Sequence, residues 1–175
     1  MVETEAVIPE CYIDTNLIQS LVPPATRYNH QKGCDNVAKV MQSKYKGRVA
    51  VGIIDKDKRK ISYLKEFEEI RSYNGDLFLL RHHSEKHYLI QISPAIEAFI
   101  IKASQEANIN LSDFDLPDQA GALKKITGNI LTQSDVRFKK LFRELKDRNC
   151  NSVETLIRWV DVIKNSKYEV KEELL

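Results

Sequence analysis

The strongest constraint on the fold of this 175-residue chain is one uninterrupted apolar run, Arg48-Val-Ala-Val-Gly-Ile-Ile-Asp55. Apolar and polar residues do not alternate along it, which is typical of a strand buried on both faces of a parallel sheet. Such a sheet needs helices on both faces to cover it. The sequence therefore predicts an α/β fold with a mostly parallel sheet between two layers of helices.

The other elements follow from residue spacing and from turn residues. Further strands are expected at 11–14, 26–30, 77–81 and 88–92, and helices at 17–22, 35–46, 61–71 and 95–106. Beyond residue 108 the strand pattern disappears, and helices are expected at 119–128, 134–147 and 152–165. Two parts result: an α/β core over 8–107, and a helical C-terminal extension over 108–168 that packs on it.

Composition excludes few function classes. The chain has 27 basic and 25 acidic residues, a balance that neither requires a nucleic-acid partner nor excludes a local basic face. Such a face is expected on helix 134–147, whose apolar half is explained by packing. Three cysteines without a CxxC pair indicate buried thiols in a reducing compartment. Neither a signal-peptide pattern nor an apolar run of about 20 residues occurs, so we expect a cytoplasmic protein without a membrane partner.

Three carboxylates fall where predicted strands end. Asp14 ends the first of them, and Asp55 and Asp57 follow the long apolar run. The carboxyl ends of parallel strands meet at one edge of a sheet, and Mg²⁺ or Mn²⁺ prefers carboxylate and water oxygens. We therefore predict Asp14, Asp55 and Asp57 as metal ligands, with Glu97 as an auxiliary catalytic residue. A solvated turn at 55–60, and a helix-start role for Glu97, are the alternatives.

Basic and histidine side chains could hold a phosphate-containing substrate near these carboxylates. The sequence offers two groups, one directly after the long apolar run and one in the polar turn 81–87: Lys56, Lys58 and Arg59, then Arg81, His83 and His87. A solvated loop explains the first group equally well and is the favoured interpretation of the second, where no cysteine or paired spacing supports zinc.

The order Asp14, Gly33, Asp55-Lys56-Asp57 resembles the Toprim fold of topoisomerases, bacterial primases and the overcoming-lysogenization-defect nucleases. In that family an acidic residue ends the first strand, a glycine turn follows the second, and a DxD motif ends the third. The resemblance covers roughly residues 10–100. It implies a Mg²⁺-dependent nuclease or phosphodiesterase of a bacterial phage-defence system, which acts on DNA or RNA beside an ATPase partner. The family has Glu at the first position, and Asp14 is one methylene shorter.

Two other interpretations remain open. The segment Tyr12-Ile-Asp-Thr-Asn-Leu-Ile18 is similar to the opening strand of PIN ribonucleases, although the later acidic residues do not follow that family's order. Alternatively, a Toprim-like scaffold could serve as a non-catalytic subunit that docks to an ATPase or a nuclease. A Walker glycine loop, a GxSxG motif and a Cys/His catalytic spacing are all missing from the sequence, which leaves NTPase, serine hydrolase and cysteine protease functions without support.

Overall fold

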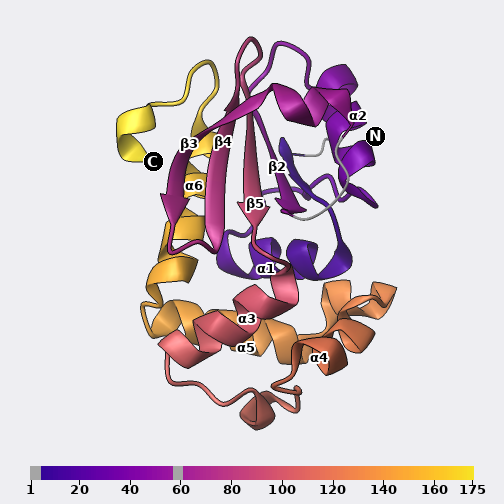
Figure 1. Ribbon diagram of the computed structural model, residues 1–175, viewed down its shortest axis with the longest axis vertical. Helices are drawn as coiled ribbons and strands as arrows, with labels where there is room; N and C mark the ends of the chain where they lie inside the picture. The colour runs from indigo at the N-terminus through magenta and orange to yellow at the C-terminus, as the bar shows by residue number, and fades with distance from the viewer. Residues whose placement is uncertain (1–4, 57–60) are drawn as a thin grey trace.

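The computed structural model describes residues 5–56 and 61–175, which form a five-stranded sheet with helices on both faces (Figure 1). The strands are β1 (Val7–Pro9), β2 (Ala50–Asp55), β3 (Phe67–Tyr73), β4 (Leu77–His82) and β5 (His87–Ile92). The helices are α1 (Tyr12–Leu21), α2 (Cys34–Lys44), α3 (Ile96–Glu106), α4 (Ala120–Thr127), α5 (Val136–Asp147) and α6 (Asn151–Asn165). Short 3-10 turns are η1 (Ser62–Glu66), η2 (Leu111–Phe114), η3 (Ile130–Ser134) and η4 (Glu172–Leu174).

The sheet is mixed, in the order β1-β2-β5-β4-β3. β1, β2 and β5 run parallel to one another, whereas β4 and β3 are antiparallel to their neighbours. The α/β class is thus confirmed, and the prediction of a mostly parallel sheet is wrong. The error lies at 61–71, which was expected to be a helix: the chain makes one 3-10 turn there and then the edge strand β3.

An extended segment at 27–31 lies beside β1 where a second strand was expected. Asn29 N donates to Val7 O at 3.0 Å, Gln31 N donates to Pro9 O at 3.0 Å, and Tyr28 forms a parallel bridge with Glu5. Four neighbouring segments, 27–31, β1, β2 and β5, therefore run in the same direction. We call the edge where they end the carboxyl edge; Figure 1 shows α1 and α3 beneath it.

Two apolar cores cover the faces of the sheet. On one face α2 and η1 pack against β2 and β5, and Gly52 of β2 lets Val37 and Met41 of α2 approach closely. On the other face α1, α3, α5 and α6 share one continuous core with the sheet, including the buried Trp159. The helices after residue 108 therefore have no separate core, and α4 to α6 begin and end within two residues of the predicted bounds. In the part of the chain that is described, the helices are too short or too polar to cross a bilayer.

Candidate metal centre

Glu10, which sequence analysis missed, occupies the position predicted for Asp14. β1 ends at Pro9, so Glu10 is the first residue beyond the first strand. The predicted strand at 11–14 is wrong, because Cys11 caps α1 and Asp14 lies in the first helical turn. The seven residues similar to the PIN opening strand, 12–18, likewise lie in this helix. The acidic residue at the end of the first strand is therefore a glutamate.

Glu10 and Asp55 meet across the two adjacent parallel strands β1 and β2. Glu10 is 1% exposed, and its Oε2 accepts a hydrogen bond from Asp55 N at 3.1 Å. Its backbone N–H donates to Ile53 O at 3.0 Å, which extends the pairing beyond β1. The Glu10 side chain is thereby fixed against the strand end that carries Asp55.

Asp55 also holds the start of α3. It is the last residue of β2, and its Oδ1 accepts a hydrogen bond from Ile96 N, at the start of that helix, at 3.1 Å. A carboxylate is stabilised at a helix N-terminus by the exposed N–H groups and the helix dipole. The placement of Asp55 at the carboxyl edge agrees with its sequence prediction.

Asp14 is buried and forms a capping box with Cys11. Its Oδ2 accepts hydrogen bonds from Cys11 N at 3.2 Å and from Cys11 Sγ at 2.9 Å. Burial raises the pKa of the Cys11 thiol, and the charges of Asp14 and Asp55 raise it further. Cys11 therefore stays protonated and is not a nucleophile, and Asp14 serves first to begin α1.

The expected glycine turn borders this centre. Gly33 has φ +91°, a left-handed conformation that favours glycine, and it precedes α2 directly. Its N–H donates to Glu10 O at 3.3 Å. A cavity of about 550 Å³ opens here, lined by Glu10, Gly33, the first turn of α2, Lys32 and Lys39. The N-terminus of α2 and two lysines thus lie beside the buried glutamate.

The remaining predicted residues of this centre are placed differently. Asp57, Lys58 and Arg59 lie outside the described residues. Lys56 extends over the ring of Phe78, with Nζ 3.3 Å from its centroid, and so packs against β4. Glu97 is buried in the first turn of α3, where its Oε1 accepts a hydrogen bond from Thr127 Oγ1 of α4.

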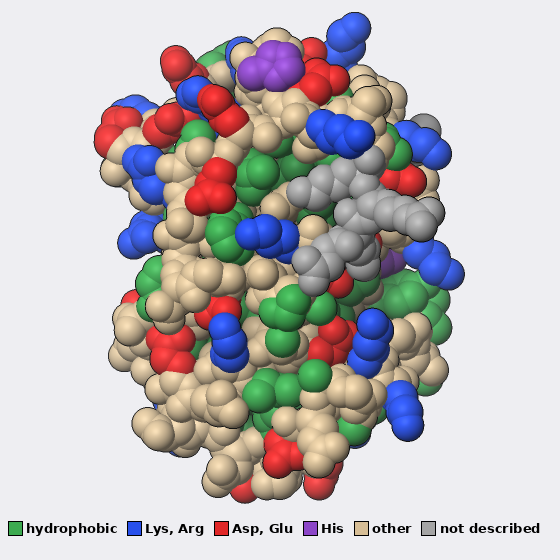
Figure 2. Space-filling view, in the orientation of Figure 1, with side chains coloured by type: hydrophobic (Ala, Val, Ile, Leu, Met, Phe, Trp, Pro, Cys, Tyr) green, Lys and Arg blue, Asp and Glu red, His purple; other side chains and the backbone are tan. Residues whose placement is uncertain are grey.

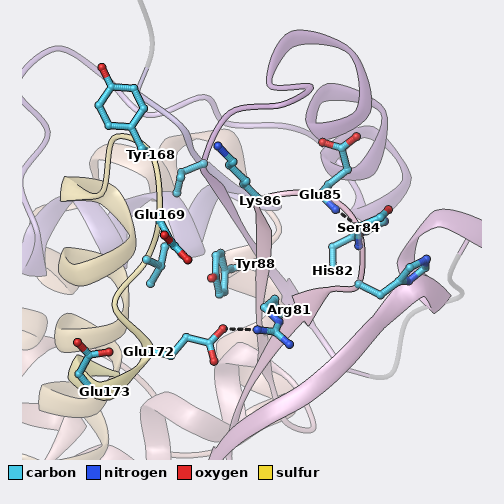
Figure 3. A pocket seen from close by; sticks show the side chains of 13 residues that line it. Arg81, His82, Ser84, Glu85, Lys86, Tyr88, Tyr168, Glu169, Glu172 and Glu173 are labelled. Atoms are coloured by element: carbon cyan, nitrogen blue, oxygen red, sulfur yellow. Dashed lines mark hydrogen bonds and ion pairs between the residues drawn. The ribbon is translucent and has the colours of Figure 1, made fainter.

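Arg81, His83 and His87 lie at the opposite end of the strands from Asp55, so the structure does not bring them together with the carboxylates. In the β2–β5 register His87 pairs with Ala50 and Asp55 pairs with Ile92, which separates the two ends by roughly 16 Å of strand. The reason is the antiparallel hairpin: the turn between β4 and β5 falls where β2 begins. It borders a cavity of about 830 Å³, in which Arg81 pairs with Glu172 of the C-terminal segment at 2.7 Å (Figure 3).

His87 is a structural residue. It is fully buried, its Nε2 donates to Tyr45 O at 3.0 Å, and its Nδ1 accepts a hydrogen bond from the Tyr63 hydroxyl. Burial lowers the pKa of this imidazole. The neutral ring is thus committed on both nitrogens and cannot contact a substrate.

Glu66, His82 and His83 offer three ligand atoms within 4.8 Å of one another. The Nδ1 atom of His82 accepts hydrogen bonds from Ser84 N and Glu85 N, both at 3.1 Å, so it carries no proton. The proton of the neutral ring is then on Nε2, which lies 3.3 Å from Glu66 Oε2. A metal ligand needs a lone pair at that atom, and this group therefore does not fit a metal in the observed arrangement.

Two buried histidines and a half-buried one make stability fall in acid. Burial lowers the pKa of His30, His82 and His87 below the ordinary value of about 6.5. Below that pH the unfolded chain binds protons that the folded chain excludes, so folding stability is present near neutrality and is lost as pH falls. The free energy of unfolding should decrease by up to about 1.4 kcal/mol per pH unit for each such histidine.

Urea unfolding at about pH 7 and about pH 5 measures this effect. His87→Gln should remove about one proton from the difference in proton uptake between the unfolded and the folded chain, and so make the free energy of unfolding depend less on pH. Equal stability of the original chain at both pH values would contradict the prediction.

No family model, no curated protein and no solved structure matches this chain. Its function must therefore be inferred from the residues and their geometry.

Proposed function

We propose that the chain is a metal-dependent phosphodiesterase or nuclease of the Toprim type, with Glu10 and Asp55 as ligands to Mg²⁺ or Mn²⁺. The observation that carries the proposal is the placement of Glu10 and Asp55 at the ends of adjacent parallel strands, where the backbone N–H of Asp55 donates to Glu10 Oε2 at 3.1 Å. Sequence places Asp57 two residues beyond Asp55, as a further acidic ligand.

The donor set fits a hard divalent cation. It consists of carboxylates, and each of the two described ones is oriented by a backbone N–H group, Glu10 by Asp55 N and Asp55 by Ile96 N. Such second contacts fix the direction of a ligand before the ion binds. A divalent ion held there polarises a phosphoryl oxygen and lowers the pKa of a bound water.

The surroundings suit a phosphodiester substrate. Gly33 and the first turn of α2 line the cavity beside Glu10, and helix N-termini favour anions. Lys32 and Lys39 line the same cavity together with the acidic Asp35, and the two lysines supply positive charge for the phosphate groups. These residues would bind and orient the nucleic acid, whereas the carboxylates hold the ion. Action beside an ATPase partner, implied by the resemblance to Toprim defence nucleases, stays a prediction.

Metal titration tests the proposal. Calorimetric titration should show that Mg²⁺ and Mn²⁺ bind to the original chain. The Asp55→Asn/Asp57→Asn variant should bind these ions about 10–100-fold more weakly. Cleavage of plasmid DNA or single-stranded RNA should disappear in the same variant. The matched control is Asp147→Asn, which changes an exposed aspartate at the end of α5 and should leave both readouts unchanged.

Full cleavage by the double variant would overturn the proposal. Metal binding without cleavage in the original chain would favour the non-catalytic subunit on the same scaffold.

A further inference from the structure

Three large apolar side chains are exposed within seven residues, which follow the end of α4 and include the first residue of α5. Ile130 is 62% exposed, Leu131 is 72% exposed and Val136 is 58% exposed. They belong to residues 128–136, which we call the apolar turn. Single exposed apolar residues are common on proteins, but a group of three in seven residues indicates a contact surface.

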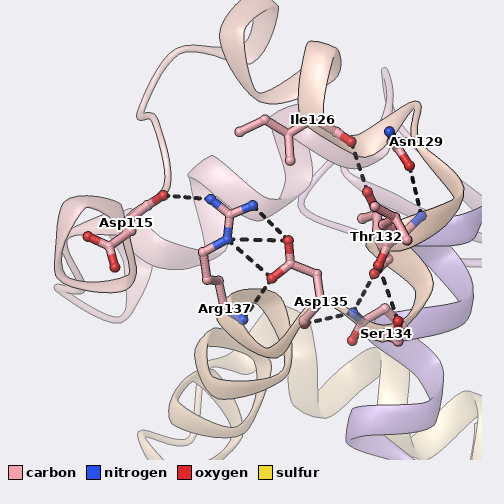
Figure 4. Close-up of polar contacts among 9 residues, drawn as sticks. Asp115, Ile126, Asn129, Thr132, Ser134, Asp135 and Arg137 are labelled. Carbon is pink, nitrogen blue, oxygen red and sulfur yellow. Dashed lines mark hydrogen bonds and ion pairs between the residues drawn. The ribbon is translucent and has the colours of Figure 1, made fainter.

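Hydrogen bonds hold the apolar turn in one shape (Figure 4). Asn129 Oδ1 accepts from Leu131 N at 2.9 Å, and Thr132 Oγ1 donates to a backbone carbonyl of α4 at 2.8 Å. Asp135 caps α5 by accepting from Arg137 N at 2.9 Å, and the Arg137 guanidinium pairs with the same carboxylate at 2.7 Å. This pairing lowers the pKa of Asp135. The turn thus presents its apolar tip to solvent on a fixed backbone, which reduces the entropy lost on binding.

The apolar turn lies beside the carboxyl edge of the sheet. Asp55 accepts a hydrogen bond from Ile96 N at the start of α3, and the next residue, Glu97, accepts one from Thr127 at the end of α4. From the other side, Asn16 of α1 donates to two carbonyl groups of the apolar turn at 2.7 and 3.1 Å. Of the two helices beside the carboxylates, α1 therefore contacts the turn directly, and α3 contacts the last residue of α4, just before the turn.

The segment that carries the apolar turn is basic. Residues 120–148 contain eight basic and three acidic residues, whereas the rest of the chain contains 19 basic and 22 acidic ones. Lys124 and Lys125 are exposed in the last turn of α4, directly before the apolar turn, and Lys140 and Arg143 are exposed on α5 directly after it. Figure 2 shows blue and green side chains close together over α4 and the turn that follows it.

We propose that the apolar turn and its flanking lysines bind single-stranded nucleic acid and guide it to the carboxylates; this rests on the proposed function. Lysines neutralise phosphates regardless of base sequence. Exposed Ile and Leu side chains contact the faces of unpaired bases, which a duplex keeps stacked. Charge complementarity with the phosphate backbone, together with an apolar tip, thus favours a single strand over a duplex.

Fluorescence anisotropy tests the proposed binding of a single strand. The probes are a labelled single-stranded DNA of about 20 nucleotides and its duplex, and EDTA is present so that metal-dependent cleavage does not occur. Lys124→Glu/Lys125→Glu should weaken binding of the single strand at least about tenfold and reduce the salt dependence of log K by about 1.4. Ile130→Ser/Leu131→Ser should weaken binding of the single strand severalfold and of the duplex hardly at all. The matched control, Lys46→Glu/Lys65→Glu, makes the same charge change at exposed positions outside the basic segment and should bind within about twofold of the original chain.

Three results would overturn the inference: unchanged binding by the Lys124/Lys125 variant, tighter binding of the duplex than of the single strand, or an unchanged affinity of the Ile130/Leu131 variant. If the last variant instead changes the oligomeric state in light scattering, the apolar turn is a protein contact. Binding that depends on the turn, without cleavage in any metal, would disprove the proposed function and leave this binding surface established.

Discussion

Glu10→Gln is expected to reduce metal-dependent cleavage at least about 100-fold while the protein stays folded. Glutamine has the same shape, and its side-chain oxygen can still accept the hydrogen bond from Asp55 N. It lacks the negative charge that a divalent cation requires of its ligand. The activity should be measured in parallel with metal titration and thermal unfolding, so that a loss of the site is distinguished from a loss of the fold.

Asp14→Asn is the matched control for this prediction. Asp14 accepts from Cys11 N and Cys11 Sγ in the capping box of α1, so its replacement should cost about 1 kcal/mol of stability. Cleavage should persist within a few-fold of the original chain. The opposite pattern, loss of cleavage in Asp14→Asn and retention in Glu10→Gln, would show that Asp14 and not Glu10 is the metal ligand.

The exchange of Asp14 for Glu10 shows where sequence reasoning about the site failed. β1 has three residues and ends at a proline, which makes it a weak strand signal. Cys11 caps α1 although cysteine is not among the usual capping residues, and the Cys11–Asp14 capping box was therefore not recognised. The sequence did contain a signal for Glu10, since this acidic residue directly follows the apolar Val7-Ile8-Pro9.

The part of the site that follows from the sequence is the strand β2 and its terminal Asp55. An unbroken apolar run defines the strand, because it is too short for a typical buried helix and most of its residues are β-branched. By contrast, Leu64, Phe67 and Ile70 have helical spacing, yet Phe67 and Ile70 lie in β3 because this strand pairs with β4. Tertiary pairing overrides local spacing in short segments.

The position of the histidine turn depends on how the two strands beside it are connected. Its residues lie between two strands whether the second strand runs parallel or antiparallel to the first. A parallel arrangement needs a crossover of about a dozen residues, whereas four residues separate β4 and β5. That short connection makes the hairpin antiparallel and takes His83 and His87 to the edge away from Asp55. The length of the connection was the signal available.

Gly52→Val should destabilise the protein by about 3 kcal/mol. Gly52 lies in the middle of β2, directly beneath α2, and a Cβ there would be 2.8 Å from Val37 Cγ1, 2.8 Å from Leu89 Cδ2 and 3.2 Å from Met41 Sδ. Leu89 can adjust at its end, but Val37 is branched next to the backbone and α2 must move to make room. β2 carries Asp55 and pairs with β1, which precedes Glu10. We therefore expect that a shift of β2 reduces metal affinity as well.

Urea unfolding measures the loss, and Gly121→Ala is its matched control. Gly121 lies in α4, and a Cβ at this position would meet no atom within 4 Å. Alanine there should raise stability by about 0.5–1 kcal/mol, because it restricts the unfolded chain and favours the helix. The two glycines are thus expected to respond with opposite signs. A stable Gly52→Val variant with unchanged metal affinity would show that α2 does not pack on β2 as closely as the structure has it.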